Sequence, residues 1–182
     1  METYNLNQTI EKLKGPTKEQ IAFYNQSAAV ALDKYHVDSN TIFDFLIDGN
    51  NRPALLKWDS SFSKVAMKEK KDIANFGGVS LAMFVMSVLL DYKYVEQTEI
   101  GDGVDYRFLK EEPNDDNLNF LEDPNFHFVE VSGVLEESKT NTLKGRIQDK
   151  HRQIIRGAMR NEKSSVIVTL FSKSKVVKEV HK

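Results

Sequence analysis

Two carboxylates in the second half of the chain have the types and spacing to bind a cation together. Asp105 follows the glycine-rich turn "GDG", and Glu130 lies in the middle of the apolar stretch "FVEVSG". If these segments are neighbouring strands, facing side chains have Cβ atoms only about 4.5–5.5 Å apart. Two carboxylates at that distance repel, so one stays protonated unless a cation lies between them. We expect Mg²⁺ or Mn²⁺, because these ions prefer oxygen ligands and commonly use one or two carboxylates.

Further polar side chains are expected beside this pair. Ser132 shares a strand face with Glu130, because side chains alternate along a strand. The basic segment after the strand brings Lys144 and Lys150 close behind it. A lysine near a metal-bound water can orient that water and offset charge on a scissile phosphate. These residues are therefore candidates for a catalytic role together with the two carboxylates.

Each carboxylate also has an ordinary interpretation. An aspartate after a glycine-rich turn often caps that turn, and Glu130 could form an ion pair with Arg107 on the next strand. An earlier segment adds two acids three residues apart, Glu69 and Asp72, which would share one helix face and could complete a metal site. The combination of an acid-bearing helix, Asp105 and Glu130, and a basic helix favours the cation site.

Charge is unevenly distributed along the chain. The formal net charge is only -2, yet eight basic residues in 139–163 are opposed by Asp149 and Glu162 alone. By contrast, 111–123 holds acidic residues and no Lys or Arg. The basic segment can meet phosphate, or it can be an ordinary solvated helix face. The candidate nucleic-acid contacts are Lys139, Arg146, Arg152 and Arg156.

Apolar periodicity predicts the elements that must position these groups. Helical spacing predicts helices over 16–34, 62–91 and 140–159, with inward-facing Ile155 and Ala158 in the last. Alternation and short apolar runs predict strands over 41–48, 54–59, 92–100, 104–110, 126–135, 164–172 and 174–180, with turn chemistry over 49–53. For 41–48 a short helix is the alternative. The sum is an α/β (α+β) fold, a mixed sheet flanked by helices with a right-handed crossover. The strand 174–180 is expected at the sheet edge.

The order helix-strand-strand-strand-helix-strand, with "GDGVDYRFL" and "FVEVSG" on successive strands, resembles the PD-(D/E)XK, or restriction-endonuclease-like, nuclease superfamily. The resemblance covers roughly 62–180. It implies one domain over 1–182, with a nuclease-like core over 62–182 and an N-terminal addition over 1–61. Members cut DNA or RNA phosphodiesters with Mg²⁺ and a metal-activated water, and Asp105 and Glu130 match their strand acids.

One position departs from the family's pattern. The family's lysine, two residues after the strand glutamate, falls on Ser132 here. The resemblance then implies that Lys144 or Lys150 on the following helix supplies the amine. Arg146 is less suited, because a guanidinium does not lose its proton.

Composition limits the remaining classes. The chain of 182 residues has a hydrophobic content of 40% and a mean hydropathy of -0.46, which fits one globular domain. No cysteine is present, which excludes disulfides and thiolate metal sites. Without an uninterrupted apolar run of eighteen residues or a secretory leader, we expect no membrane span and a cytoplasmic location.

Three functions remain open from the sequence. The first is a metal-dependent nuclease acting on DNA or RNA. The second is an inactive nuclease-like module that binds nucleic acid or a partner protein, since Ser132 replaces the expected lysine. The third is a subunit of a larger complex, or a homo-oligomer, with the acidic stretch 111–123 and the N-terminal residues as contact surface.

Overall fold

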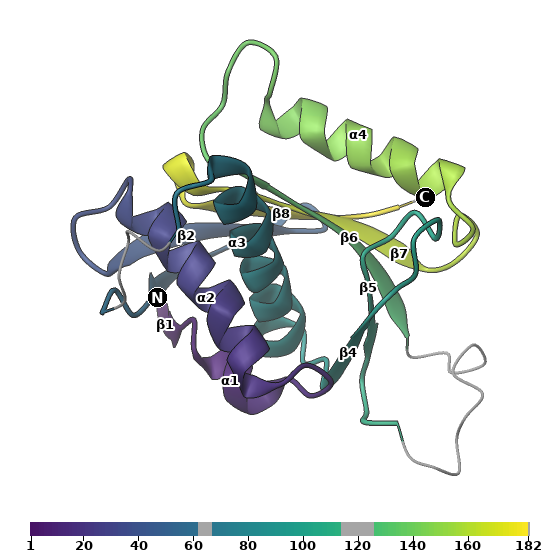
Figure 1. Cartoon of the computed structure of the whole chain (residues 1–182), viewed down its shortest axis with the longest axis horizontal. Coiled ribbons are helices and arrows are strands. Elements are labelled where there is room, and N and C mark those ends of the chain that lie inside the picture. The colour runs from purple at the N-terminus through teal and green to yellow at the C-terminus, as the bar shows by residue number, and fades with distance from the viewer. Residues whose placement is uncertain (62–66, 114–125, 182) are drawn as a thin grey trace.

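The chain forms one eight-stranded mixed sheet with helices on both faces (Figure 1). In the computed structural model, residues 1–61, 67–113 and 126–181 are described. The strands are β1 (Glu2–Asn5), β2 (Asn40–Ile47), β3 (Asn50–Lys57), β4 (Tyr94–Gln97), β5 (Tyr106–Leu109), β6 (His127–Val134), β7 (Ser164–Leu170) and β8 (Lys175–Val180). Their order across the sheet is β1-β3-β2-β8-β7-β6-β5-β4. The predicted α/β class, a mixed sheet between helices, is confirmed.

The helices divide the core into two layers. They are α1 (Gln8–Lys12), α2 (Lys18–Asp33), α3 (Lys70–Phe84) with a π-helical turn at Val85–Leu89, and α4 (Leu143–Arg156), with a 3₁₀ turn at Phe171–Lys173. Helices α1, α2 and α3 cover one face of the sheet, and α4 lies across the other (Figure 1). The larger core lies under α2 and α3, whereas a smaller core joins α4 to β6, β7 and β8.

Local signals fix where two of these helices begin. Thr17 and Gln20 form a capping box at the start of α2, which satisfies backbone N–H groups that have no partner inside the helix. Thr142 caps α4 by accepting a hydrogen bond from the Gly145 backbone N–H. Helix α4 is therefore started by its own sequence directly after β6 and its loop.

The strands nearest the candidate site form a meander followed by a crossover. Strands β4, β5 and β6 pair antiparallel in succession. Helix α4 then returns the chain so that β7 pairs with β6 in parallel. From α3 onward the order is thus α3, β4, β5, β6, α4 and β7.

The predicted position of the last strand was wrong. Strand β8 lies inside the sheet, antiparallel to β7 on one side and parallel to β2 on the other. Its Val176 and Val177 are buried, because helices cover both faces there. The N-terminal hairpin β2–β3 and β1 therefore continue the same sheet rather than standing beside it.

Several predicted boundaries also needed correction. The helix predicted over 62–91 begins at Lys70, since residues 67–69 are not helical and 62–66 lie outside the described residues. The turn predicted over 49–53 is the two-residue pair Asp48–Gly49, both with positive φ, and β3 already begins at Asn50. Asp-Gly is the usual chemistry of such a hairpin turn.

Two other predictions near the site also failed. The strand predicted over 92–100 is only the four residues of β4. On α4, Ile155 is 56% exposed rather than inward-facing, and Ala158 lies beyond the helix end.

Glycines bring α3 against β6. A Cβ added to Gly133 would lie 1.8 Å from the Ala74 carbonyl oxygen, and one added to Gly78 would lie 2.8 Å from the Gly133 nitrogen. No side chain fits between these backbones. The stretch Lys70–Leu89 is, among the described residues, the one helix long and apolar enough to span a membrane. Here it packs as a core helix against β6 and α2.

Candidate active site at Asp105, Glu130 and Lys150

Asp105 and Glu130 face each other on adjacent strands. Tyr106 is paired with Val129, so extending that register by one residue places Asp105 opposite Glu130. The Asp105 backbone N–H donates to the Val129 carbonyl at 3.0 Å. Its side-chain oxygen Oδ2 accepts from the Val131 backbone N–H at 2.8 Å. Asp105 is therefore held by two hydrogen bonds to the neighbouring strand β6. Its Oδ2 accepts from that strand, and through this bond it does not cap the turn that precedes it.

Glu130 is fully buried, on the sheet face that α4 covers. Burial and, after it, the charge of Asp105 together raise its pKa to about 8, although Lys150 opposes the shift. Its oxygen Oε2 accepts no hydrogen bond from the described residues. An orphan oxygen beside a second carboxylate needs either a proton or a cation.

Lys150 supplies the positive charge at this site. It lies on the stripe of α4 that faces the sheet, between buried Ile147 and Ile154. Its Nζ contacts Oε1 of Glu130 and lies 3.3 Å from Oε1 of Gln153. The Lys150 side chain is only 17% exposed, so it reaches buried Glu130 from the side of α4 that faces the sheet.

The structure distinguishes between the two candidate lysines. Lys144 is exposed on α4, away from the stripe that carries Lys150. Arg146 is half-buried and donates to the side chain of Asn141 at 3.0 Å. Position along the helix explains the difference, because at 3.6 residues per turn Lys144 lies about a quarter-turn away from the stripe that holds both Ile147 and Ile154. Lys150 lies three and four residues from Ile147 and Ile154.

The remaining predicted ligands are placed less favourably. Ser132 is buried, and strand alternation puts it on the Glu130 face. Glu69 caps α3 and Asp72 lies in its first turn, and both are exposed. Helix α3 packs on the opposite face of the sheet from Glu130. Among the described residues, no three acidic or histidine side chains gather around a common point, so the structure does not bring Glu69 or Asp72 to the carboxylate pair.

Arg107 forms a different ion pair from the one considered above. It contacts Glu96 on the edge strand β4. The cation that contacts Glu130 comes from α4 instead. The ion pair between Glu130 and Arg107 that the sequence suggested is therefore replaced by a contact between Glu130 and Lys150 of α4.

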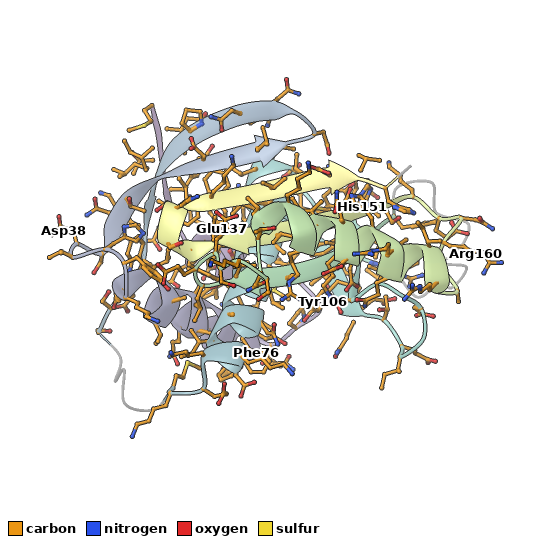
Figure 2. The ribbon with its side chains drawn as sticks, turned by 90° about the horizontal axis from the view of Figure 1, so that it is seen from above. Asp38, Phe76, Tyr106, Glu137, His151 and Arg160 are labelled. Carbon is orange, nitrogen blue, oxygen red and sulfur yellow. The ribbon has the colours of Figure 1, made fainter. Side chains whose placement is uncertain are left out.

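The basic residues of α4 and its approach lie on the outer surface. Lys139, Arg152 and Arg156 are exposed, and Arg152 contacts Asp149 one turn earlier. Viewed from above, α4 crosses the sheet with His151 over β8 and Arg160 past its end (Figure 2). Of the predicted nucleic-acid contacts, Arg152 and Arg156 therefore lie on the exposed surface of α4 and Lys139 on the segment before it, whereas Arg146 is half-buried.

Sequence reasoning missed two parts of this arrangement. Gln153 lies beside Lys150 and accepts a hydrogen bond from it. The spacing of three residues, which puts both side chains on one helix face, could have indicated this contact. The turn before Asp105 is also tied to the end of α4: Ala158 and Met159 donate backbone hydrogen bonds to the Gly101 and Asp102 carbonyls. Such long-range backbone contacts leave no pattern in the sequence.

Comparison with known proteins adds no assignment. No family model, curated protein or solved structure compared with the chain matches it.

Proposed function

We propose that this protein is a metal-dependent phosphodiesterase, a nuclease that acts on DNA or RNA. The observation that carries the proposal is the pair of facing carboxylates: Oε2 of buried Glu130 accepts no hydrogen bond from the described residues, and Lys150 contacts Oε1 of the same side chain. When both carboxylates are ionised, they and the Lys150 ammonium carry a net charge of -1 where a divalent cation would lie. The residues present therefore fit Mg²⁺ or Mn²⁺.

Each side chain would have a separate task. Asp105 and Glu130 would hold the cation, which when bound stabilises negative charge developing on a phosphate. Lys150 would donate hydrogen bonds to a phosphate oxygen or to the attacking water, because its Nζ lies at the Glu130 carboxylate. Gln153 would hold Lys150 in place.

The fold order and surface charge support this proposal. We take the order α3, β4, β5, β6, α4 and β7 as support for the proposal, because the resemblance implied a helix, three strands, a helix and a strand in succession. The exposed cations of α4 would bind the phosphate backbone, which is how proteins obtain most of their sequence-independent affinity for nucleic acid. Lys150 would then take the place of the family's strand lysine, with Ser132 beside it.

An inactive binding module is the second candidate. Ser132 stands at the family's lysine position, and among the described residues no third acid joins the pair. Such a module would bind nucleic acid with strong salt dependence and would cleave nothing.

Metal titration and cleavage together test the proposal. We expect wild-type protein to bind Mn²⁺ by isothermal titration calorimetry, and Asp105→Asn and Glu130→Gln to bind at least about tenfold more weakly. Glu99→Gln, an exposed acid in the neighbouring turn, is the matched control and should bind as wild type. Single- and double-stranded DNA and RNA are then incubated with Mg²⁺, Mn²⁺ or EDTA.

The outcomes separate the candidates. Metal-dependent cleavage that both site variants lose supports the nuclease. Mn²⁺ binding without cleavage of any substrate supports the binding module. Equal Mn²⁺ binding, or none, in wild type and both variants overturns the cation site itself.

A further inference from the structure

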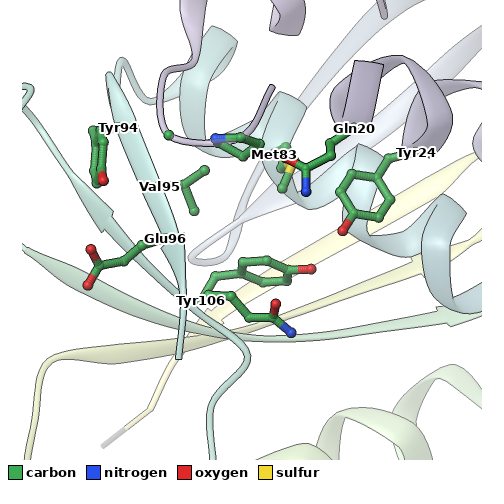
Figure 3. A pocket seen from close by; sticks show the side chains of 10 residues that line it. Gln20, Tyr24, Met83, Tyr94, Val95, Glu96 and Tyr106 are labelled. Atoms are coloured by element: carbon green, nitrogen blue, oxygen red, sulfur yellow. The ribbon is translucent and has the colours of Figure 1, made fainter. Parts of the chain in front are cut away.

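A pocket of about 230 Å³ opens on the opposite face of β5 from Asp105. It lies between the start of α2 and strands β4 and β5 (Figure 3). Pockets for whole drug-sized ligands measure roughly 300–1,000 Å³, so this one has room for one small ring system. The lining residues used below are Gln20, Tyr24, Met83, Val95, Gln97 and Tyr106.

The pocket combines flat rings with amide groups. Tyr24 and Tyr106 point their hydroxyl groups toward each other in Figure 3, and the two side chains are hydrogen-bonded. Val95 lies at the base, and alternation along β4 places Gln97 on the same face. Gln97 is exposed, so its amide is available at the mouth.

The charges of the lining residues limit the class of ligand that the pocket can bind. No lysine or arginine belongs to the described lining, so the pocket is not built for a phosphate group. Burial and the hydrogen bond to Tyr24 raise the pKa of Tyr106, so its hydroxyl stays neutral and retains its proton. Glu96 turns its carboxylate away from the pocket in Figure 3 and contacts Arg107 instead. A neutral, flat ligand with several hydrogen-bonding groups fits best.

We propose that this pocket binds a nucleobase of a single-stranded substrate. Bases stack on aromatic side chains and are read through their edges by side-chain amides. The aromatic surface continues outward from Tyr24, whose ring lies 6.1 Å from Phe76, and Phe76 in turn lies 5.1 Å from the partly exposed Phe23. A second base could stack there.

The pocket and the carboxylate pair share one short segment of chain. Tyr106 lines the pocket and the preceding Asp105 faces Glu130, on opposite faces of β5 at the point where the strand begins. Because the two sites lie on opposite faces of the sheet, a nucleic-acid strand whose base is held by Tyr106 would pass around the start of β5 to reach the carboxylate pair. The base pocket rests on the proposed function only for this last step, since base binding itself needs no metal.

Nucleosides without phosphate test the pocket alone. Adenosine, guanosine, cytidine and uridine are titrated into metal-free protein and followed by saturation-transfer NMR, with indole and p-cresol as probes for a peptide's aromatic side chain. We expect at least one nucleoside to bind, and Gln97→Leu and Tyr24→Leu to weaken it by roughly tenfold. Gln148→Leu, an exposed glutamine on α4, should bind as wild type, and circular dichroism checks that each variant is folded.

Three results would overturn the inference: no nucleoside binds folded wild-type protein, the pocket variants bind as well as wild type, or indole or p-cresol binds more tightly than every nucleoside. Asp105→Asn serves to separate the two proposals. This variant should bind nucleosides as wild type does, because the pocket needs no metal. Nucleoside binding by a wild-type protein that itself binds no Mn²⁺ would retain the base pocket and refute the nuclease.

Discussion

Replacing Glu130 with glutamine should change how stability depends on pH. Glutamine has the shape of the protonated carboxyl group but cannot ionise. In the folded chain, burial and Asp105 raise the pKa of Glu130 from 4.5 to about 8. The folded state therefore keeps a proton that the unfolded chain has already lost, and the free energy of unfolding falls as pH rises through this window.

The size of the effect follows from the two pKa values. Each unit of pKa difference is worth about 1.4 kcal/mol, so complete ionisation of Glu130 would cost the folded metal-free protein roughly 5 kcal/mol. Between pH 5 and pH 8 the contribution of this one group changes by about 3–4 kcal/mol. The wild type should lose that much stability relative to Glu130→Gln over the same range.

Urea denaturation followed by circular dichroism, in EDTA at pH 5, 6, 7 and 8, measures the difference. Subtracting the free energy of unfolding of Glu130→Gln from that of the wild type at each pH removes contributions from other titrating groups. Glu99→Gln is the exposed control, and its free energy of unfolding should change with pH as that of the wild type does. A constant difference between wild type and Glu130→Gln across this range would refute the idea that Glu130 is held protonated. Added Mn²⁺ should restore stability to the wild type at pH 8 but not to Glu130→Gln.

Four further predictions follow from the same contacts. Lys150→Met should abolish cleavage yet bind Mn²⁺ as well as or better than wild type, because the competing ammonium is gone; equal loss in the exposed Lys144→Met, seen in the same cleavage assay, would argue against this role. Arg156→Gln should weaken binding to all nucleic-acid sequences and lower the salt slope by about 1, measured by fluorescence anisotropy from 50 to 200 mM salt. Gly133→Ala should destabilise the fold by about 3 kcal/mol or more in urea, since its Cβ meets the Ala74 carbonyl oxygen. Burial lowers the pKa of His127 to about 4, so stability should be lost as pH falls from 6.5 toward 4 and this loss should be absent in His127→Gln; an NMR titration of His127 near its ordinary pKa would contradict it.

The part of the fold that could be predicted is the part set by local pattern. The period-2 stretches around the "GDG" turn gave the β4–β5–β6 meander, and its register put Asp105 opposite Glu130. The crossover through α4 followed from a basic amphipathic stretch between two strands. Helical spacing also held enough information to choose Lys150 over Lys144, since Lys150 lies on the stripe of Ile147 and Ile154.

What could not be predicted depends on distant segments. The sequence of β8 ends in polar residues like an edge strand, and its parallel pairing with β2 joins segments about 130 residues apart. Lys178 is buried in β8 only because Asp48, in the β2–β3 turn, contacts it. The elevated pKa of Glu130 likewise needs α4, β5 and β6 together.

The interior position of β8 has a consequence for how the chain folds. Strand β8 follows all the other strands in sequence, yet it lies between β2 and β7 and joins the two halves of the sheet. Until β8 is synthesised, β2 of one half and β7 of the other each have an unpaired edge where β8 will lie. Such edges can pair with strands of other chains. The closing step is a long-range pairing, and such steps are slow because the loop must first be closed at an entropic cost. A chain cut before β8 should therefore aggregate, even though the Asp105 and Glu130 strands would still be present.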